Sequence, residues 1–379
     1  MKKICFIVSS PGSAISFLKD PIYKLSNSYD IYIVANLDNE SQLSSLKIRE
    51  AKNIKIIRNI CLYRDFKAFV SLFIYFRKMK FSVVHSVTPK AGLLTALAGF
   101  FARVPNRVHI FTGQVWATRT GLMRSMLRMM DKLIALLDTN LLVDGEGQRR
   151  FLIEQGVLNH NNSSVLASGS ICGVNLERFS PNPEIRLAVR KELSIPDGSI
   201  VFVFLGRLCI DKGIRELLNA FAKLADTYEN VFLLLVGRDE GNCVSMVEDM
   251  PSLKPGVNLM FYGQTPFPER LLKAGDVFCL PTYREGFGSS VIEASCLGLP
   301  VICSDAYGVT DAMIDEVTGI RCQVKDVQSL YIAMMRLYSD PELRIKLGSN
   351  GRQRVLDYFS SNIVTNEWIS FYKSLLNKS

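Results

Sequence analysis

The stretch Asp276-Val-Phe-Cys-Leu-Pro-Thr-Tyr-Arg-Glu-Gly-Phe-Gly-Ser-Ser-Val-Ile-Glu293 predicts a strand, a turn and the start of a helix. Its residues 277–280 are a short apolar run, typical of a buried strand in a parallel sheet. Ser290 is the expected N-cap of the helix, which should end at Gly298, shortly before a proline. Glu285 should then lie just beyond the carboxyl end of the strand, where parallel sheets bind ligands.

The bulk composition indicates a soluble or peripheral protein with more than one domain. The chain has 379 residues, of which 48% are hydrophobic and 21% charged. A single hydrophobic core is unusual for a chain of this length. Its nine cysteines form no C-x-x-C pair, which favours a reducing cytosol and argues against a structural zinc site. We find no signal peptide, and the most apolar stretches, 69–76 and 91–102, are shorter than a spanning helix.

The positive charge of the chain is concentrated in its first half. The net charge is +9; residues 1–178 contain 24 Lys and Arg against 12 Asp and Glu, whereas residues 179–379 contain 21 against 24. This asymmetry predicts that the first half faces an acidic partner, either a polyanion or an anionic membrane. Because no nucleic-acid-binding module is recognisable, we expect no nucleic-acid partner.

Strands and helices should alternate along the chain. The expected strands are residues 3–8, 31–34, 54–57, 82–84, 108–111, 200–205, 231–236, 257–262, 277–280 and 301–304. The expected helices are residues 15–25, 67–79, 91–102, 123–137, 213–228, 290–297, 341–358 and 362–376. This alternation predicts an α/β fold with parallel, doubly wound sheets.

A polar, proline-containing stretch, residues 178–184, separates two such series. We therefore predict two Rossmann-like domains, residues 1–178 and 179–358. Residues 359–379 form a last helix that either extends the second domain or crosses back to the first.

Two carboxylates, Glu285 and Glu293, flank a pair of glycines, Gly286 and Gly288. The glycines let the backbone approach a ligand, and the helix N-terminus beyond them offers free N–H groups to a phosphate. The carboxylates could accept hydrogen bonds from sugar hydroxyls on either side of that phosphate. An alternative explains Glu293 without a ligand, because Ser290 and Glu293 have the spacing of a capping box.

Arg207 and Lys212 form a second candidate constellation, in a glycine-containing loop after the expected strand 200–205. They should emerge at the same sheet edge as Glu285, where two cations could neutralise a diphosphate leaving group. The alternative is a solvated basic loop before a helix. Two constellations in one domain favour the functional interpretation.

These motifs occur in a fixed order: Gly206-Arg207, Lys212-Gly213, Val236-Gly237, Phe261-Tyr-Gly263, and Glu285-Gly-Phe-Gly288 followed by Glu293. In order and spacing they resemble the retaining family 4 glycosyltransferases. The segments 83–92 and 173–181 are similar to that family's first-domain and interdomain segments, so the resemblance spans nearly the whole chain. Residues 111–116 resemble the bacterial members that build surface polysaccharides on a lipid carrier. The resemblance implies a GT-B fold, in which two Rossmann-like domains face each other across a cleft.

The resemblance also implies roles for the matching residues. Arg207 and Lys212 would hold the diphosphate of a nucleotide sugar, Glu285 would contact the sugar, Glu293 would bind the ribose hydroxyls, and Phe261–Gln264 would lie near the base. The implied catalytic residues are Glu285, Arg207 and Lys212. The implied donor-binding residues are Gly206, Arg207, Lys212, Gly237, Tyr262, Gly263, Glu285, Gly286, Phe287, Gly288, Ser289 and Glu293. The donor would be a UDP-sugar substrate, with no cofactor, and no metal because no Asp-x-Asp occurs.

The chain departs from the family pattern in its first half. Many relatives have a His-Gly pair that reaches the transferred sugar, and here Thr112-Gly113 takes its place. His109 is three residues earlier and should point to the opposite face of its strand, as a core or sheet-surface histidine. His85 follows a short apolar run and is the better candidate for the cleft. The candidate acceptor-binding residues are Gly12, Ser13, His85, Lys90, Thr112, Gly113 and Arg119.

Residues 116–132 mix basic residues with Met and Leu at helical spacing. Such a helix could rest on an anionic lipid surface. The alternative is an ordinary amphipathic helix that buries its methionines in the core. The family's common use of lipid-diphosphate acceptors favours the membrane interpretation.

We therefore predict a retaining, metal-independent glycosyltransferase that moves a hexose or N-acetylhexosamine from a nucleotide sugar to a lipid-diphosphate-linked saccharide. It would act in O-antigen, capsule or related glycan synthesis, on the cytoplasmic face of the cell membrane. Three alternatives stay open at this point: a nucleotide-sugar 2-epimerase of the same fold, a non-enzymatic polyanion-binding protein, and an inactive scaffold.

Overall fold

The computed structural model describes residues 1–57 and 59–377, which form two compact units. Unit 1 consists of Met1–Gly173 together with Ser361–Ser379, and unit 2 consists of Val174–Ser360. The chain therefore leaves unit 1 once and returns to it with the last helix. The boundaries expected from sequence, after residues 178 and 358, differ from these by a few residues.

Unit 1 is built on a seven-stranded parallel sheet of order β3-β2-β1-β4-β5-β6-β7. Its strands are β1 (Lys3–Ile7), β2 (Asp30–Ala35), β3 (Glu50–Asn53), β4 (Val83–Ser86), β5 (Asn106–Phe111), β6 (Asn140–Val143) and β7 (Ser163–Val165). The expected strand 54–57 is wrong, because the edge strand β3 ends at Asn53. Ile54 and Ile56 are buried after the strand has ended, so their alternation reflects loop packing and not strand pairing.

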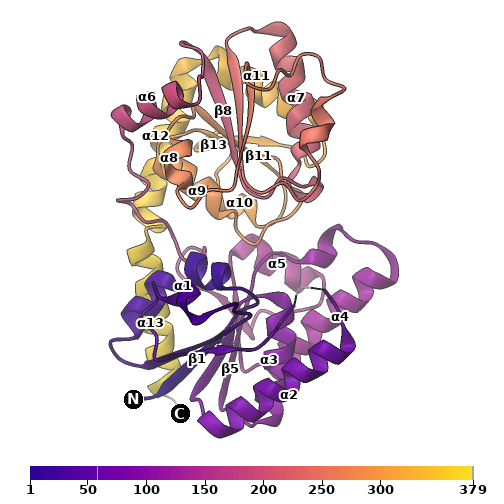
Figure 1. Ribbon diagram of the computed structural model, residues 1–379, viewed down its shortest axis with the longest axis vertical. Helices are drawn as coiled ribbons and strands as arrows, with labels where there is room; N and C mark the ends of the chain where they lie inside the picture. The colour runs from indigo at the N-terminus through magenta and orange to yellow at the C-terminus, as the bar shows by residue number, and fades with distance from the viewer. Residues whose placement is uncertain (58, 378–379) are drawn as a thin grey trace. The chain divides into compact units, whose positions relative to one another are not determined.

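Helices cover both faces of this sheet. They are α1 (Pro11–Leu25), α2 (Leu62–Met79), α3 (Pro89–Phe101), α4 (Gly121–Leu137), α5 (Glu146–Glu154) and α13 (Ser361–Asn377), with short 3₁₀ turns η1 (Glu40–Leu43) and η2 (Val115–Thr118). Alternate residues of β1 enter different cores: Ile4 and Phe6 pack with α1 and α13, whereas Cys5 and Ile7 pack with α2 and α3. Figure 1 shows α1 beside α13, and α2, α3 and α4 together.

The last helix, α13, is an integral part of unit 1. Trp368 is fully buried and donates its indole N–H to the carbonyl oxygen of Ile171 at 2.9 Å, and Val364 and Tyr372 are buried beside it. Of the two arrangements left open by the sequence, the structure has the helix on the first unit. Its aromatic side chains complete the core over β1 and β4.

Unit 2 is built on a six-stranded parallel sheet of order β10-β9-β8-β11-β12-β13. Its strands are β8 (Ile200–Leu205), β9 (Val231–Val236), β10 (Leu259–Gly263), β11 (Val277–Leu280), β12 (Val301–Ser304) and β13 (Gly319–Cys322). Its α-helices are α6 (Pro183–Glu192), α7 (Ile214–Thr227), α8 (Pro268–Leu272), α9 (Ser289–Cys296), α10 (Val309–Ala312), α11 (Val327–Ser339) and α12 (Pro341–Tyr358), with 3₁₀ turns η3 (Ile210–Lys212) and η4 (Val244–Val247).

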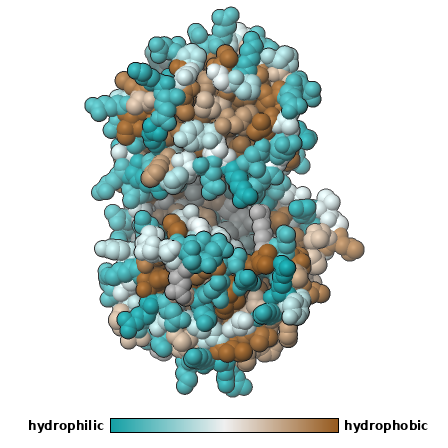
Figure 2. Space-filling model, viewed as in Figure 1, coloured by the Kyte–Doolittle hydropathy of each residue, from teal (hydrophilic) through white to brown (hydrophobic). Residues whose placement is uncertain are grey.

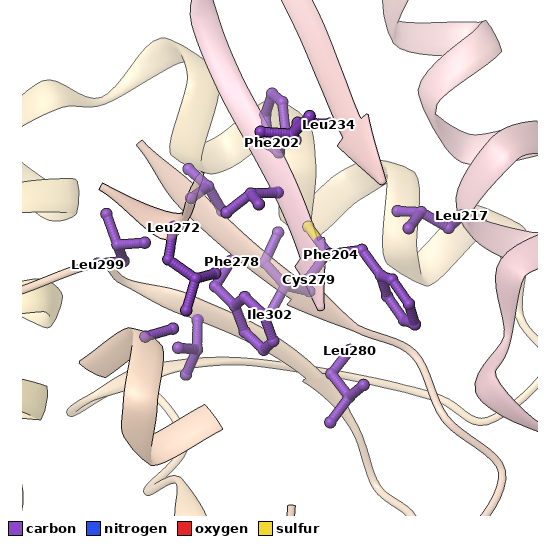
Figure 3. Close-up of a cluster of buried hydrophobic side chains, with 14 of the residues drawn as sticks. Phe202, Phe204, Leu217, Leu234, Leu272, Phe278, Cys279, Leu280, Leu299 and Ile302 are labelled. Carbon is purple, nitrogen blue, oxygen red and sulfur yellow. The ribbon is translucent and has the colours of Figure 1, made fainter. Parts of the chain in front are cut away.

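The central strands of unit 2 are apolar along their whole length because helices cover both faces of the sheet. Figure 3 shows Phe202 and Phe204 of β8 with Phe278 of β11 and Ile302 of β12, all without solvent exposure. Such close packing fixes the strand ends, and with them the loops that leave the carboxyl edge.

Candidate functional site

The candidate site of unit 2 is formed by loops at the carboxyl edge of its sheet. Residues 206–213 follow β8, residues 237–243 follow β9 and residues 281–288 follow β11. Since β8 lies between β9 and β11 in a parallel sheet, these three loops leave the same edge side by side. Both sequence-predicted constellations lie on these loops.

Lys212 and Glu285 form an ion pair between the loops after β8 and β11. The two side chains are 17% and 16% exposed, so water screens the pair only partly. The structure thus brings together two residues that the sequence singled out separately. A cation and a carboxylate in contact can face the two ends of a sugar phosphate, the cation toward the phosphate and the carboxylate toward hydroxyls.

Arg207 hydrogen bonds to Glu240 at 2.7 Å, which we did not predict from the sequence. Burial lowers the pKa of the guanidinium, but the hydrogen bond with Glu240 and the charges of Cys209, Glu240 and Glu285 more than offset this, so the net pKa is raised. Arg207 is therefore held in its charged form close to Glu285. The acidic turn after β9 was the available signal for Glu240, because it leaves the same edge.

A pocket of about 330 Å³ opens beside Arg207. It is lined by Leu205, Gly206, Arg207, Val236, Gly237, Arg238, Glu240, Gln264, Thr265 and Pro268. Gly237 is required here, since a Cβ at this position would lie 1.7 Å from the carbonyl oxygen of Gly206. Its N–H donates to the carbonyl of Gly263 at 2.9 Å, which places Tyr262 and Gly263 at the adjoining strand end.

A second set of contacts fixes the loop that carries Glu285. Arg284 pairs with Asp211 at 3.0 Å, and the carbonyl oxygen of Asp211 accepts hydrogen bonds from the Tyr283 N–H at 2.8 Å and the Thr282 hydroxyl at 3.1 Å. These residues immediately precede Lys212 and Glu285 in the sequence. We did not predict them, although opposite charges next to each member of the central pair were a usable signal.

The turn before α9 differs from the expectation. Gly288, at φ 90°, is the N-cap and the helix begins at Ser289, so the predicted N-cap at Ser290 is wrong. The left-handed backbone conformation at this turn favours glycine, and Ser290 is already inside the helix. The capping box between Ser290 and Glu293 is therefore not formed. The expected end of the helix at Gly298 is confirmed, with Cys296 as the last helical residue.

Glu293 lies in the second turn of α9 and is half-buried. Burial raises the pKa of its carboxyl to about 7; the charge of Arg178 opposes the shift and that of Glu269 adds to it. These two neighbours come from the segment before α6 and from α8, next to Pro268 of the pocket. Glu293 is thus placed on the α8 side of the site, whereas Glu285 is placed on the η3 side.

Among residues 1–57 and 59–377, no three His, Cys, Asp or Glu side chains are grouped as a metal site would require.

In unit 1 the structure contradicts His85 as an acceptor-binding residue. His85 is fully buried, hydrogen bonds through Nδ1 to the Tyr372 hydroxyl at 2.7 Å and stacks on Trp368. Burial lowers the pKa of its imidazole well below the ordinary value. The helix α13 covers it, which the local sequence could not show. His109 is also buried and hydrogen bonds to Ser86 at 2.8 Å, as expected of a core histidine.

The remaining acceptor candidates lie at the carboxyl edge of the unit 1 sheet. Gly12 and Ser13 are not in a loop as expected, because α1 begins at Pro11 with Ser10 as its N-cap. Lys90 forms an ion pair with Asp65 at 2.6 Å and donates a hydrogen bond to the carbonyl oxygen of Asn59. Thr112 and Gly113 follow β5 and are half-buried, and Arg119 is exposed after η2.

The methionine stripe of α4 is not in the core. Leu122 is 91% exposed, and Met123, Met126 and Met129 are exposed as well. Only Asp131 and Ile134 of this helix are buried. The alternative of a helix that buries its methionines is therefore wrong.

Comparisons with known proteins identify the family. The model of the family "Glycosyl transferases group 1" matches residues 186–354. Over 351 residues the chain is 30% identical to the capsular polysaccharide biosynthesis glycosyltransferase CapM of Staphylococcus aureus, covering 92% of this chain and 91% of that protein. It is 27% identical over 311 residues to the UDP-Gal:alpha-D-GlcNAc-diphosphoundecaprenol alpha-1,3-galactosyltransferase of Escherichia coli, covering 80% and 78%.

Solved structures confirm the expected fold of two Rossmann-like units. Anabaena Alr3699/HepE in complex with UDP and glucose superposes with a TM-score of 0.83 at 18% identity, covering 99% of this chain and 100% of that one. At this identity the likeness concerns the fold alone. The match to CapM over nearly the full length carries the assignment: the chain belongs to the group 1 glycosyl transferases.

Proposed function

We propose that the protein is a retaining glycosyltransferase that transfers a hexose or N-acetylhexosamine from a UDP-sugar to a lipid-diphosphate-linked saccharide. The observation that carries this proposal is the Lys212–Glu285 ion pair, placed on the loops beside the pocket of Arg207. It puts cations and a carboxylate at one edge of a sheet, as a sugar diphosphate requires. Family membership as a glycosyl transferase disfavours the epimerase and the polyanion-binding alternatives.

The donor is bound by unit 2. The 330 Å³ pocket between Gly206, Gly237 and Gln264 accommodates the uracil and its ribose, next to Tyr262 and Gly263 at the end of β10. Arg207 and Lys212 hold the diphosphate, and Gly286, Phe287, Gly288 and Ser289 present backbone N–H groups to the sugar or phosphate. A uridine donor is supported by the UDP-Gal named for the relative from Escherichia coli.

The transfer proceeds on one face of the sugar. The bond between the anomeric carbon and the β-phosphate oxygen breaks, and the acceptor hydroxyl oxygen forms its new bond from the same side. The acceptor proton passes to the departing phosphate oxygen. Arg207 and Lys212 stabilise the charge that develops on the diphosphate, each by roughly 3 kcal/mol. Glu285 orients the sugar through its hydroxyls, and the two cations supply the neutralisation that a metal would otherwise supply.

The acceptor is bound by unit 1, at the edge that carries Lys90, Thr112, Gly113 and Arg119. A lipid-diphosphate acceptor is supported by the diphosphoundecaprenol named for the Escherichia coli relative. We place the reaction at the cytoplasmic face of the membrane. In the described part of the chain, no helix reaches the length and apolarity that crossing a membrane requires.

The exposed faces of α2 and α4 are the proposed contact with the membrane. We call them the apolar-basic surface; its residues are Leu62, Tyr63, Arg64, Phe66, Lys67, Leu122, Met123, Arg124, Met126, Arg128 and Met129. Figure 2 shows apolar side chains exposed among hydrophilic ones on unit 1. The two acids of these helices are Asp65, which pairs with Lys90, and Asp131, which is buried. Exposed apolar side chains next to unopposed cations fit the headgroup region of an anionic bilayer.

The decisive experiment measures hydrolysis and transfer with a panel of uridine, guanosine and dTDP sugars, with and without membranes that contain a lipid-diphosphate acceptor. We expect turnover of a UDP-sugar that depends on the acceptor, with retention of the anomeric configuration in the product, and no loss of activity in EDTA. Inversion, or activity that EDTA abolishes, would overturn the proposed mechanism.

A further inference from the structure

Arg178 lies in the segment before α6 and reaches the wall of the candidate donor pocket. Its guanidinium donates to the carbonyl oxygen of Pro266 at 2.8 Å and pairs with Glu269 at 2.7 Å. Its own backbone N–H is held by the side chain of Asn175 at 2.9 Å, and its guanidinium lies over the ring of the buried Phe179. The backbone of Arg178 is thus held by Asn175, and its guanidinium is held by Pro266 and Glu269.

The guanidinium of Arg178 contacts the segment that forms one wall of the pocket. Gln264, Thr265 and Pro268 line the cavity, and Pro266 and Glu269 stand between and next to them in the chain. This loop connects the end of β10 to the five-residue helix α8, and within it the Phe267 N–H donates to the Thr265 hydroxyl oxygen at 3.1 Å. Arg178, which stands 88 positions before Pro266 in the sequence, adds to this wall a contact from outside the loop.

Arg178 also faces the carboxylates of this side of the site. Glu269 is only 14% exposed, and the charges of Arg178 and Glu269 both act on Glu293. Other titratable or charged groups near this part of α9 are Cys296, whose pKa is raised by burial, and Arg352 of α12, which donates to the carbonyl oxygen of Cys296 at 3.2 Å. One guanidinium thus faces two carboxylates.

We propose that Arg178 is a positioning residue for the nucleotide of the donor, because it holds the 264–268 wall of the pocket and faces Glu293 with the opposite charge. The inference rests on the proposed function, in which Glu293 accepts hydrogen bonds from the ribose hydroxyls. The ionised carboxylate accepts from both hydroxyls more strongly than the protonated carboxyl does. Since burial raises the pKa of Glu293 to about 7, the cation opposite keeps a larger fraction of it ionised near neutral pH.

The test is UDP binding to the full chain by isothermal titration calorimetry between pH 6 and 8.5, with UDP-sugar kinetics. Arg178→Ala should weaken UDP binding about tenfold at pH 7.5, as expected for one lost charge-assisted contact. It should raise the donor KM more than it lowers kcat. It should also shift the loss of UDP binding at low pH to a higher pH. Arg178→Lys should restore part of the affinity. Arg270→Ala is the control, because Arg270 is next to Glu269 on α8 but pairs with the exposed Glu192, and it should change binding less than twofold.

A second variant separates charge from loop structure. Glu269→Gln removes the carboxylate that raises the pKa of Glu293, so its binding profile should move to lower pH, opposite to that of Arg178→Ala. Profiles that move in the same direction, or an Arg178→Ala variant that binds UDP like the wild type, would overturn the inference while leaving the proposed function intact. A wild-type protein that binds no UDP would overturn both.

Discussion

Lys212 and Glu285 meet across 73 positions of sequence, and their ion pair ties the loop after β8 to the loop after β11. The neighbouring pair of Asp211 and Arg284 ties the same two loops in the opposite charge order. The carboxyl edge of unit 2 is therefore fixed by two adjacent ion pairs of opposite charge order. Such preorganisation lets the site stabilise developing charge without first rearranging.

Replacing Glu285 by Gln should reduce kcat roughly 100-fold, since one well-placed contact to the transferring group is lost. Lys212 would lose its charged partner, so we also expect the free energy of unfolding to fall by about 1–3 kcal/mol. Transfer assays and urea unfolding measure the two effects. Glu316→Gln removes an exposed ion pair with Arg336 and should change neither quantity appreciably. Retained turnover in Glu285→Gln would count against the assigned site.

Arg207→Lys should lower kcat at least tenfold, although the charge is conserved. The planar guanidinium can hydrogen bond to Glu240 with one N–H group and bind a phosphate with two others. The ammonium group of lysine cannot do both. Steady-state kinetics with the preferred UDP-sugar measures the effect. Arg238→Lys, in the same pocket, provides the comparison, and an equal loss of kcat in the two variants would show that the effect is not specific to Arg207. An unchanged kcat in Arg207→Lys would show that charge alone matters.

Glu293→Gln should stabilise the fold at alkaline pH. The carboxyl pKa is about 7 in the folded protein and ordinary in the unfolded chain, so the folded state binds the extra proton between these values and wild-type stability falls as the pH rises through 7. At pH 8 the glutamine variant should therefore be more stable by on the order of 2 kcal/mol, and at pH 5 nearly equal to the wild type. Thermal unfolding at the two pH values checks this, and UDP binding should be weaker in the variant. Equal stabilities at pH 8 would contradict it.

Tyr372→Phe should destabilise unit 1 without affecting the acceptor KM. The change leaves Nδ1 of the buried His85 without its hydroxyl partner, at a cost of about 1–3 kcal/mol. Because the folded-state pKa of His85 is depressed, wild-type stability should also decline as the pH falls below the unfolded value near 6.5. Chemical unfolding and acceptor titrations measure these effects. A raised acceptor KM with unchanged stability would return His85 to the acceptor site.

The double replacement of Leu62 and Phe66 by Ser, and that of Leu122 and Met126 by Ser, should each weaken binding to vesicles with anionic phospholipid roughly tenfold or more. Exposed apolar side chains would no longer enter the headgroup region, and high salt should weaken wild-type binding as well. Co-sedimentation with vesicles measures the loss. Ile345→Ser is the control, since Ile345 is 69% exposed on α12 of unit 2. Equal loss in the control, or none in the double variants, would contradict the proposed surface.

Where strands are buried on both faces, the sequence predicted them well. The strands 200–205, 231–236, 277–280 and 301–304 coincide with β8, β9, β11 and β12. A short uninterrupted apolar run bounded by turn residues is typical of a strand that is buried on both faces. The polar edge strand β3 carries no such signal. The strands β6, β7 and β13 were not predicted either: β7 and β13 include the polar residues Ser163, Ser164 and Arg321, and β6 has only three apolar residues.

Long-range packing explains most of what the sequence did not predict at the site. The pairing of Lys212 with Glu285 followed from strand order, because both loops leave one edge. The burial of His85 depends instead on a helix almost 300 positions later, and nothing near His85 indicates it. Likewise, the pattern of α4 is amphipathic whether its methionines face a core or solvent.

The return of the chain to unit 1 sets the order in which the protein can mature during synthesis. Every residue of unit 2 has been translated by Ser360, whereas the core over β1 and β4 still lacks Trp368 and Tyr372 at that moment. Since domains fold as units, unit 2 can complete its fold on the ribosome first, and unit 1 completes its core last.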